Sequence, residues 1–294
     1  MPSKFILLTG ITGFLGSNLA SALVEKGYHV IALKRKSSSL KRIESIISKI
    51  DLYDIEEVDF STIFKKYDKI DAIIHTATAY GRNNETPYEI FEANTGFPLK
   101  ILDAASVAGV SKFINTDTIL DKYLNLYSLS KNHLLEWGKF YSMRNKIEFI
   151  NMRLEHFYGP GDDDSKFTSY VINNCLSNSS QPLNLTLGEQ RRDFIYIDDV
   201  VSAYLILLDR KMESDNWFSE YDVGSGESVT IRKFVETVHN ITKSNIELNF
   251  GAVPYRVGEV MNSKANISGL KKLGWNCRFT LEKGLKLTIV ALKS

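Results

Sequence analysis

Three evenly spaced glycines follow a short apolar run near the start of the chain, and this pattern constrains the fold more than any other feature. Residues 5–9 are almost entirely apolar, which is typical of a strand buried on both faces. A helical pattern of apolar residues follows over residues 16–26 and ends at Gly27. Glycines at such a junction, here Gly10, Gly13 and Gly16, permit a tight turn and let N–H groups at the helix N-terminus approach a pyrophosphate. The sequence therefore predicts a dinucleotide-binding strand–turn–helix unit.

Further apolar runs of strand length alternate with helical patterns through the first half of the chain. These runs cover residues 30–33, 72–75, 112–115 and 149–153, and one helical pattern between them covers residues 94–108. The alternation predicts an α/β fold of the Rossmann type, in which a doubly wound parallel sheet carries helices on both faces.

The character of the chain changes after Tyr158-Gly159-Pro160-Gly161, where three acids and then a Ser/Asn-rich stretch at residues 173–180 follow. We expect a dinucleotide-binding domain over residues 1–158, to which residues 190–225 return in part. Residues 159–294 are expected to form mainly a smaller, less regular C-terminal α/β lobe that binds the substrate.

Composition excludes several other classes of protein. The 36 Lys and Arg residues nearly cancel the 35 Asp and Glu residues, so no strong field would recruit nucleic acid or an anionic membrane. Cys175 and Cys277 stand alone, which argues against a disulfide framework and against a metal site. The apolar run at the N-terminus is too short to span a membrane. We therefore expect a soluble, cytoplasmic protein without a bound metal.

A basic segment, Lys34-Arg35-Lys36, ends the second predicted strand, and Arg42 lies slightly beyond it. Sites that prefer NAD usually carry an acid there, whereas basic residues accommodate the 2′-phosphate of NADP. A solvated basic loop is the alternative interpretation. The segment favours NADP(H) over NAD(H), with Lys34 and Arg35 as the phosphate contacts.

Tyr127 and Lys131 lie four residues apart, so on a helix they share one face. A neighbouring ammonium is expected to lower the pKa of the phenol. Such a tyrosine can donate a proton to a carbonyl oxygen while a hydride reaches the carbon. This spacing also arises by chance. The position of the pair after the strand at residues 112–115 is what makes Tyr127 and Lys131 a catalytic candidate.

Together these glycines, Tyr127 and Lys131 resemble the extended short-chain dehydrogenases/reductases, in particular the NAD-dependent epimerase/dehydratase family that acts on nucleotide sugars. The resemblance runs through nearly the whole chain. It implies that the cofactor is held by the glycine loop, the basic segment and several later matches, namely Gly10, Thr12, Gly13, Phe14, Leu15, Lys34, Arg35, Asp59, Phe60, Thr76, Ala77, Thr78, Asn94, Tyr127 and Lys131.

The family places a Ser or Thr at the end of the strand before the tyrosine, where its hydroxyl binds the substrate oxygen. The matching register is Thr118, with Thr116 as the runner-up. The resemblance thus implies a catalytic set of Thr118, Tyr127 and Lys131. The loop between Thr118 and Tyr127 is much shorter than in most relatives.

Two arginines resemble the residues with which the family holds the substrate diphosphate. They are Arg192 in Arg-Arg-Asp-Phe and Arg256 in Arg-Val-Gly-Glu, and a guanidinium suits phosphate oxygens because it is always charged and can bind two of them. The full set of substrate contacts implied by the resemblance is Thr78, Thr118, His156, Lys166, Phe167, Arg192 and Arg256. Most relatives carry Asn at position 156 and an aromatic residue at position 155. His156 and Glu155 therefore either bind the sugar nucleotide or form a satisfied polar pair.

Three reactions share this scaffold: reduction with NADPH, 4-epimerisation with retained NAD, and 4,6-dehydration. Dehydratases follow their threonine with Asp-Glu, whereas Thr116-Asp117-Thr118 lacks the glutamate, which disfavours dehydration. The basic segment suits a diffusible NADPH. Residues 154–159, 166–169, 175–178 and 193–197 resemble reductases of nucleotide-linked 4-keto-6-deoxy and 3,6-dideoxy hexoses, in particular CDP-linked ones of O-antigen biosynthesis.

Two other functions remain open at this point. One is a nucleotide-sugar 4-epimerase with bound NAD, and the other is a non-catalytic NADP-binding sensor on the same fold. The partners expected are a nucleotide-diphosphate sugar and, because relatives commonly dimerise through the helix of the Tyr/Lys pair, a second copy of the chain. Trp137 and Phe140 fit such a dimer face or ordinary core packing.

Overall fold

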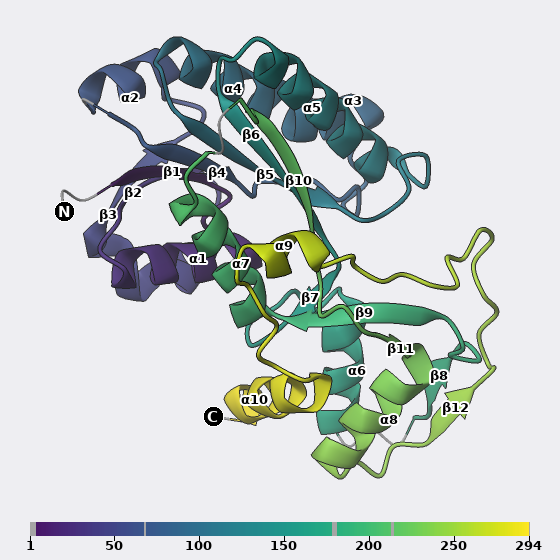
Figure 1. The fold of residues 1–294 in the computed structure, drawn as a ribbon. Coiled ribbons are helices and arrows are strands. Elements are labelled where there is room, and N and C mark those ends of the chain that lie inside the picture. The colour runs from purple at the N-terminus through teal and green to yellow at the C-terminus, as the bar shows by residue number, and fades with distance from the viewer. Residues whose placement is uncertain (1–3, 68, 178–180, 213–214, 294) are drawn as a thin grey trace. The chain divides into compact units, whose positions relative to one another are not determined.

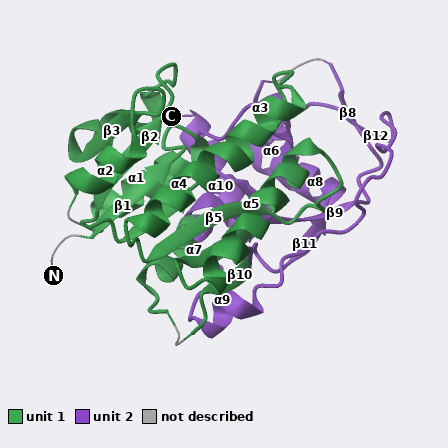
Figure 2. Ribbon diagram, turned by 90° about the horizontal axis from the view of Figure 1, so that it is seen from above, with its two compact units in different colours: residues 1–153, 201–221 green, residues 154–200, 222–294 purple. Residues whose placement is uncertain are grey.

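The computed structural model describes residues 4–67, 69–177, 181–212 and 215–293. The chain divides into two compact units, and Figure 2 colours them separately. Unit 1 comprises residues 1–153 and 201–221, and unit 2 comprises residues 154–200 and 222–294.

A seven-stranded sheet forms the centre of unit 1, with the strand order β10-β6-β5-β4-β1-β2-β3 (Figure 1). Its strands are β1 (Phe5–Thr9), β2 (His29–Lys34), β3 (Ile50–Asp54), β4 (Ala72–His75), β5 (Lys112–Thr118), β6 (Glu148–Leu154) and β10 (Phe218–Val223). The pairs β1–β2, β2–β3, β1–β4 and β4–β5 are parallel. The order reverses between β1 and β4, which is where doubly wound sheets bind nucleotides beyond the carboxyl ends of the strands. The predicted Rossmann-type sheet is confirmed.

Helices cover both faces of this sheet. Figure 1 shows α2 (Phe60–Lys66), α3 (Pro87–Phe91), α4 (Phe97–Val107) and α5 (Leu126–Met143) on one face, with α1 (Phe14–Glu25) and α7 (Ile197–Asp209) on the other. A 3-10 helix, η1 (Lys41–Lys49), leads into β3. The boundary between the units falls within α7.

The core under α4 and α5 places the Tyr/Lys helix close to the sheet. Phe113 on β5 and Phe149 on β6 stack with ring centroids 5.5 Å apart and 9° between their planes. A Cβ at Gly138 on α5 would lie 2.3 Å from the Phe149 ring, so glycine is needed for this close packing. The packing fixes α5 against the amino-terminal halves of β5 and β6.

One expected helix, over residues 94–108, is divided in the structure. A π-helical turn, η2 (Glu92–Gly96), precedes α4. The reason lies in Pro98, which has no N–H and whose ring would clash with the carbonyl four residues earlier, that of Asn94. Widening the helix to a π turn relieves this clash, and such turns are frequent at functional sites.

Unit 2 contains two small sheets and four helices within its described residues. The sheets have the orders β11-β9-β7 and β12-β8. The elements are β7 (His156–Tyr158), α6 (Phe167–Leu176), β8 (Leu183–Leu185), β9 (Arg191–Tyr196), β11 (Ser228–Thr230), α8 (Ile231–Thr242), β12 (Leu248–Phe250), α9 (Ser268–Lys272) and α10 (Leu281–Lys293). The Ser/Asn-rich stretch begins inside α6, and residues 178–180 lie outside the described part of the chain. In the described ranges, a helix that could span a membrane is not found.

Candidate active site

The glycine loop connects β1 to α1 as expected, and two of its glycines are required by close packing. Gly10 has a φ of 70°, and a Cβ there would lie 2.6 Å from the backbone nitrogen of Ala77. A Cβ at Gly16 would lie 2.1 Å from the carbonyl oxygen of Gly10. Gly13 is the N-cap of α1, and no described side chain caps this helix end. The N–H groups of the first turn, at Phe14 and Leu15, are therefore oriented to bind an anion such as a pyrophosphate.

The basic segment is more strongly paired than the sequence suggested. Lys34 is ion-paired with Asp54 on β3, and the Lys36 ammonium lies 2.7 Å from Glu57. Arg35 is exposed. The guanidinium of Arg42, on η1, donates a hydrogen bond of 3.3 Å to the carbonyl of Thr12 in the glycine loop. Register between β2 and β3 brings Asp54 opposite Lys34, and the sequence alone does not reveal this pairing.

Asp59 and Phe60 have structural partners in the described chain. The Asp59 carboxylate caps α2 by accepting a hydrogen bond of 3.0 Å from the Ser61 backbone. Hydrogen bonds from the Ser61 side chain and backbone lower the pKa of Asp59. The Phe60 ring contacts Phe97 edge-on at 6.1 Å and packs on the core. An adenine contact by this pair stays a prediction.

Threonine hydroxyls hold the loop after β4 against β1. The Thr76 hydroxyl donates to the Thr9 carbonyl at 2.7 Å, and the Ala77 backbone donates to the Thr9 hydroxyl at 3.2 Å. The same Thr9 hydroxyl lies 2.8 Å from Nδ1 of the buried His75. These bonds place residues 76–78 beside the glycine loop.

Asn94 joins this loop to the Tyr/Lys helix. Its Oδ1 accepts from the Ala79 backbone at 2.7 Å and from the Thr78 hydroxyl at 3.1 Å. Its Nδ2 donates to the Ala79 carbonyl at 2.8 Å and to the Ser130 hydroxyl at 2.9 Å. The side chain is fully buried in the π turn and uses its complete hydrogen-bonding capacity.

The helix α5 presents Tyr127 and Lys131 together. Asn125 begins the helix with a capping box, in which its side chain accepts a 2.9 Å bond from the Ser128 backbone. Tyr127 lies in the first turn and is partly buried, and Lys131 follows one turn later with 1% of its surface exposed. The predicted one-turn spacing is therefore present on a helix.

The two candidate threonines have different partners. The Thr118 side chain interacts with the phenol of Tyr127 and lowers the pKa of this group, against the larger effect of burial. The Thr116 hydroxyl instead lies 2.6 Å from the hydroxyl of Tyr204 on α7. Thr118 is thus the threonine that the described structure brings to the Tyr/Lys pair.

The expected lowering of the Tyr127 pKa is not what the structure gives. Burial raises this pKa well above its usual value, and Tyr80 and Asp117 raise it further. Burial also lowers the pKa of Lys131 to about 8, and the Asp117 carboxylate opposes this shift. A neighbouring ammonium can be read from the sequence, whereas the loss of solvation at both groups cannot.

Lys131 provides the test of whether a nicotinamide cofactor fits. Its buried Nζ finds no hydrogen-bond partner among the described residues. A buried ammonium is costly without acceptors, and the hydroxyls of a nicotinamide ribose supply them. Together with the glycine loop and α1, this group fits a dinucleotide.

Tyr127 has two further neighbours that were not predicted from the sequence, Tyr80 and Asp117. The Tyr80 ring lies 5.0 Å from the Tyr127 ring, and the guanidinium of Arg82 lies 4.9 Å from the Tyr80 ring. Asp117 is 6% exposed and precedes Thr118 on β5. Polar residues at alternate positions 115 and 117 of an otherwise buried strand were a signal that could have revealed it.

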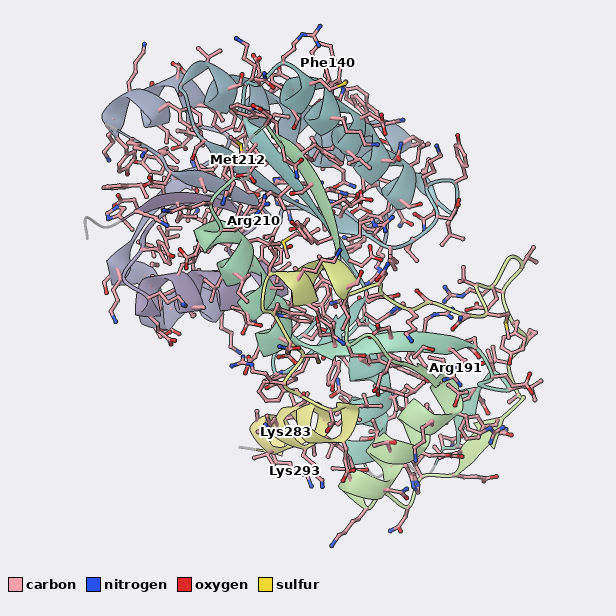
Figure 3. The ribbon with its side chains drawn as sticks, viewed as in Figure 1. Phe140, Arg191, Arg210, Met212, Lys283 and Lys293 are labelled. Atoms are coloured by element: carbon pink, nitrogen blue, oxygen red, sulfur yellow. The ribbon has the colours of Figure 1, made fainter. Side chains whose placement is uncertain are left out.

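In unit 2, Arg192 already has protein partners. Its guanidinium donates at 2.5 Å both to the carboxylate of Glu259 and to the carbonyl of Val260. Its exposed neighbour on β9, Arg191, is labelled in Figure 3 and binds Ser228. Arg256 is exposed and precedes Glu259 by three residues. The ion pair therefore joins the two predicted diphosphate-binding segments.

The unusual pair at positions 155 and 156 is hydrogen-bonded within unit 2. Nδ1 of His156 lies 3.1 Å from the Glu155 carboxylate, whose other oxygen accepts a 2.5 Å bond from Ser263. The Glu155 side chain is fully buried, and the His156 side chain is 39% exposed. This matches the satisfied polar pair foreseen as one alternative and still leaves the imidazole accessible.

Lys166 and Phe167 lie at the start of α6. The Lys166 ammonium lies 2.9 Å from Asp162 and 4.0 Å from the centre of the Phe157 ring. Phe167 is 37% exposed and contacts the Phe234 ring. Across the described residues of both units, no group of three His, Cys, Asp or Glu side chains is arranged to hold a metal ion.

Comparisons with known proteins agree with this arrangement. A model of the NAD dependent epimerase/dehydratase family matches residues 6–224. CDP-abequose synthase of Salmonella muenchen is 38% identical over 291 residues, covering 97% of this chain and 96% of that protein. The CDP-abequose synthase of Salmonella typhimurium is 35% identical over 292 residues, covering 96% of each.

Solved structures show the same fold at lower identity. A UDP-glucose 4-epimerase of Thermotoga maritima has a TM-score of 0.86 at 24% identity, with 98% of each chain covered. A UDP-glucuronic acid 4-epimerase of Bacillus cereus has a TM-score of 0.83 at 24% identity, covering 98% of this chain and 99% of that chain. The family model and the near full-length relatives show that this chain belongs to the NAD dependent epimerase/dehydratase family, and that it is an NAD(P)-dependent nucleotide-sugar enzyme.

Proposed function

We propose that the protein reduces, with NADPH, the C4 ketone of a nucleotide-linked 4-keto-6-deoxy or 3,6-dideoxy hexose, in particular a CDP-linked one. The observation that carries this proposal is the buried ammonium of Lys131, which lies one helical turn after Tyr127 and has no hydrogen-bond partner among the described residues, together with the interaction of Thr118 with the Tyr127 phenol. A ketone oxygen needs a proton donor and an orienting hydroxyl, and these two side chains supply both.

In the proposed reaction, bound NADPH supplies the hydride that reaches C4. The Tyr127 phenol donates its proton to the ketone oxygen, and Thr118 orients that oxygen. Lys131 binds the ribose hydroxyls of the cofactor. A raised pKa keeps Tyr127 protonated at neutral pH, which is the state that a reduction requires.

Two further points support the finer assignment. Relatives named CDP-abequose synthase match almost the whole chain, which favours a CDP-linked substrate of O-antigen dideoxyhexose synthesis. A cytoplasmic location is part of the proposal. The exposed Arg35 and the position of Arg42 beside the glycine loop favour the 2′-phosphate of NADPH over NAD. On the substrate side, Arg192 and Arg256 would hold the diphosphate.

A homodimer is part of this proposal. On α5, Trp137, Phe140 and Met143 are 41%, 38% and 76% exposed, and Figure 3 labels Phe140. Large apolar side chains that gather on the exposed face of one helix commonly mark an interface.

The test is a panel of CDP-, dTDP-, UDP- and GDP-linked 4-keto-6-deoxy sugars, with and without oxygen at C3. The purified protein is incubated with NADPH, and loss of the NADPH absorbance is followed. We expect oxidation that depends on the sugar nucleotide and is fastest with the CDP-linked, C3-deoxygenated ketone. Stoichiometric NAD extracted from the purified protein, without turnover on any ketone, would instead support a 4-epimerase.

A further inference from the structure

A chain of buried polar side chains crosses three strands of unit 1 next to the Tyr/Lys pair. The Asp117 carboxylate on β5 accepts a hydrogen bond of 2.7 Å from the Thr118 backbone and one of 2.8 Å from Nδ2 of Asn151 on β6. The same Nδ2 donates a hydrogen bond of 2.9 Å to the Glu220 carboxylate on β10. Oδ1 of Asn151 accepts a hydrogen bond of 2.8 Å from Nδ2 of Asn115. The amide of Asn151 thus holds two carboxylates at fixed positions.

The two carboxylates differ in how their charge is balanced. Glu220 is ion-paired with Arg153 at 3.5 Å. Asp117 has no ion-pair partner among the described residues, although it is only 6% exposed. The described cation on which its charge acts is the ammonium of Lys131. A buried carboxylate without an ion-pair partner is costly, and such groups cluster at functional sites.

Several other groups face the pair and could set its proton state. The loop after β4 contributes Tyr80 and Arg82, which act on Tyr127 in opposite directions. From β4, His75 faces Lys131, but burial and then the charge of Lys131 hold the pKa of this imidazole well below its usual value. From α7, Tyr204 faces Asp117.

Among these groups, Asp117 is the carboxylate that acts on both members of the pair. It opposes loss of the proton from Tyr127, and it opposes the effect of burial on Lys131. Both actions hold the pair in its fully protonated form. That form can donate a proton to a ketone, whereas it cannot take one from an alcohol.

We infer that Asp117 is a positioning residue for the proton-donating state of the site, whose negative charge, held in place by Asn151, keeps Lys131 as an ammonium and Tyr127 as a phenol. This inference rests on the proposed reductase function. In each turnover, hydride from NADPH forms the C–H bond at C4, and the Tyr127 proton forms the O–H bond. The ketone is reduced, NADPH is oxidised to NADP⁺, and a proton from solvent restores Tyr127.

The direct test removes the charge and keeps the shape, with Asp117→Asn. Reduction needs protonated Tyr127, so kcat falls as pH rises through the pKa of this phenol. Without the carboxylate, the basic limb of the kcat profile should move to lower pH by roughly one unit, the lower end of the effect of a nearby charge. Asp117→Glu should retain the wild-type profile. Glu220→Gln is the matched control, because it changes the other carboxylate on Asn151, and its profile should also match wild type.

A second measurement does not require substrate. In protein labelled with [13C]lysine at Cε, the Lys131 resonance is identified by its loss in Lys131→Met. It should titrate near the pKa of about 8 in the wild type and at lower pH in Asp117→Asn. Asp117→Ser serves the same purpose if the asparagine variant does not fold.

The outcomes separate the two proposals. If the wild type reduces no ketone in the panel, the proposed reductase function fails, and the lysine titration alone decides the role of Asp117. If the wild type is active but neither the profile nor the lysine titration moves in the charge-removing variants, the inference about Asp117 is overturned.

Discussion

The predicted functional side chains of the two units differ in how the protein satisfies them. In unit 2, Arg192, Lys166 and His156 each have a carboxylate partner, at 2.5 Å, 2.9 Å and 3.1 Å. In unit 1, the Nζ of Lys131 is buried without a partner in the described chain. Three of the groups proposed to bind the substrate are therefore already paired, whereas Lys131, which is proposed to bind the cofactor, is not.

This difference has a physical consequence for binding. A buried group without a partner destabilises the free protein, and a ligand that supplies the missing acceptor recovers that free energy. A paired arginine must instead divide its hydrogen bonds between its carboxylate partner and an arriving diphosphate. Part of the free energy of the arginine–carboxylate pair is therefore lost when the diphosphate binds. Its pairing, in return, fixes the guanidinium before the substrate binds. Substitutions at Tyr127, Arg192, Lys131 and Arg35 test this contrast.

Tyr127→Phe should lower kcat by about 10³-fold, because the proton donor to the ketone is lost. Cofactor binding should stay close to wild type, since the ring and Lys131 remain. Steady-state NADPH oxidation and a fluorescence titration with NADPH measure the two effects. Tyr123→Phe, in the exposed loop before α5, is the control and should have normal turnover. Near-normal turnover of Tyr127→Phe would contradict the assignment of the acid.

Arg192→Gln should raise the KM for the sugar nucleotide by roughly a hundredfold, the effect of truncating one partner of a partly buried charge pair. It should also lower the free energy of unfolding, because Glu259 loses its cation. Substrate titration and urea unfolding measure both. In the control Arg191→Gln, which changes the exposed neighbour on β9, both values should remain near wild type.

Lys131→Met should stabilise the cofactor-free protein by about 2 kcal/mol at neutral pH, because an unpaired buried ammonium is removed. The folded-state pKa of Lys131, about 8, lies below the usual 10.5, so the unfolded chain binds this proton more tightly. The penalty is therefore complete below about pH 8 and fades as the pH rises towards 10.5.

Urea unfolding of Lys131→Met at several pH values, in the absence of nucleotide, measures this gain. The control is Lys139→Met, at an exposed lysine paired with Glu136 on the same helix. Loss of stability in Lys131→Met at neutral pH would mean that the ammonium is satisfied in solution, and the contrast between the units would disappear.

Arg35→Gln should reduce the preference for NADPH over NADH by about tenfold, equivalent to about 1.4 kcal/mol, when measured as the ratio of kcat/KM values. Lys36→Gln is the control, because Glu57 already binds this ammonium at 2.7 Å. If both variants reduce the preference equally, the preference comes from the summed positive charge of the basic segment and not from a specific contact between Arg35 and the phosphate.

The local pattern of the sequence predicted most of the dinucleotide-binding fold. Residues 5–9 and 72–75 are strands with the expected bounds, and the glycine loop leads into α1. These elements depend on interactions between near neighbours in the chain. The π turn at residues 92–96 was not foreseen, because it results from a clash between Pro98 and a carbonyl one turn earlier. The 3-10 helix over residues 41–49 was also missed.

The site was predicted less completely, because its side chains are paired over long sequence distances. Lys34 was proposed as a phosphate contact, but the register of β2 and β3 pairs it with Asp54. The pKa of Tyr127 was expected to fall, but burial raises it. Asp117 was considered only as part of a dehydratase motif, since the sequence does not reveal that Asn151 holds it in place.

Asn94 has a consequence for any attempt to redesign this enzyme. All four hydrogen-bonding positions of its amide are occupied, by the loop at residues 78–79 and by Ser130 on α5. Aspartate would lack both donors, and glutamine would need space that a fully buried site does not offer. Even these two similar residues therefore cannot replace Asn94 without loss of hydrogen bonds or packing. Libraries aimed at a new cofactor or sugar should vary the residues around it and leave this amide unchanged.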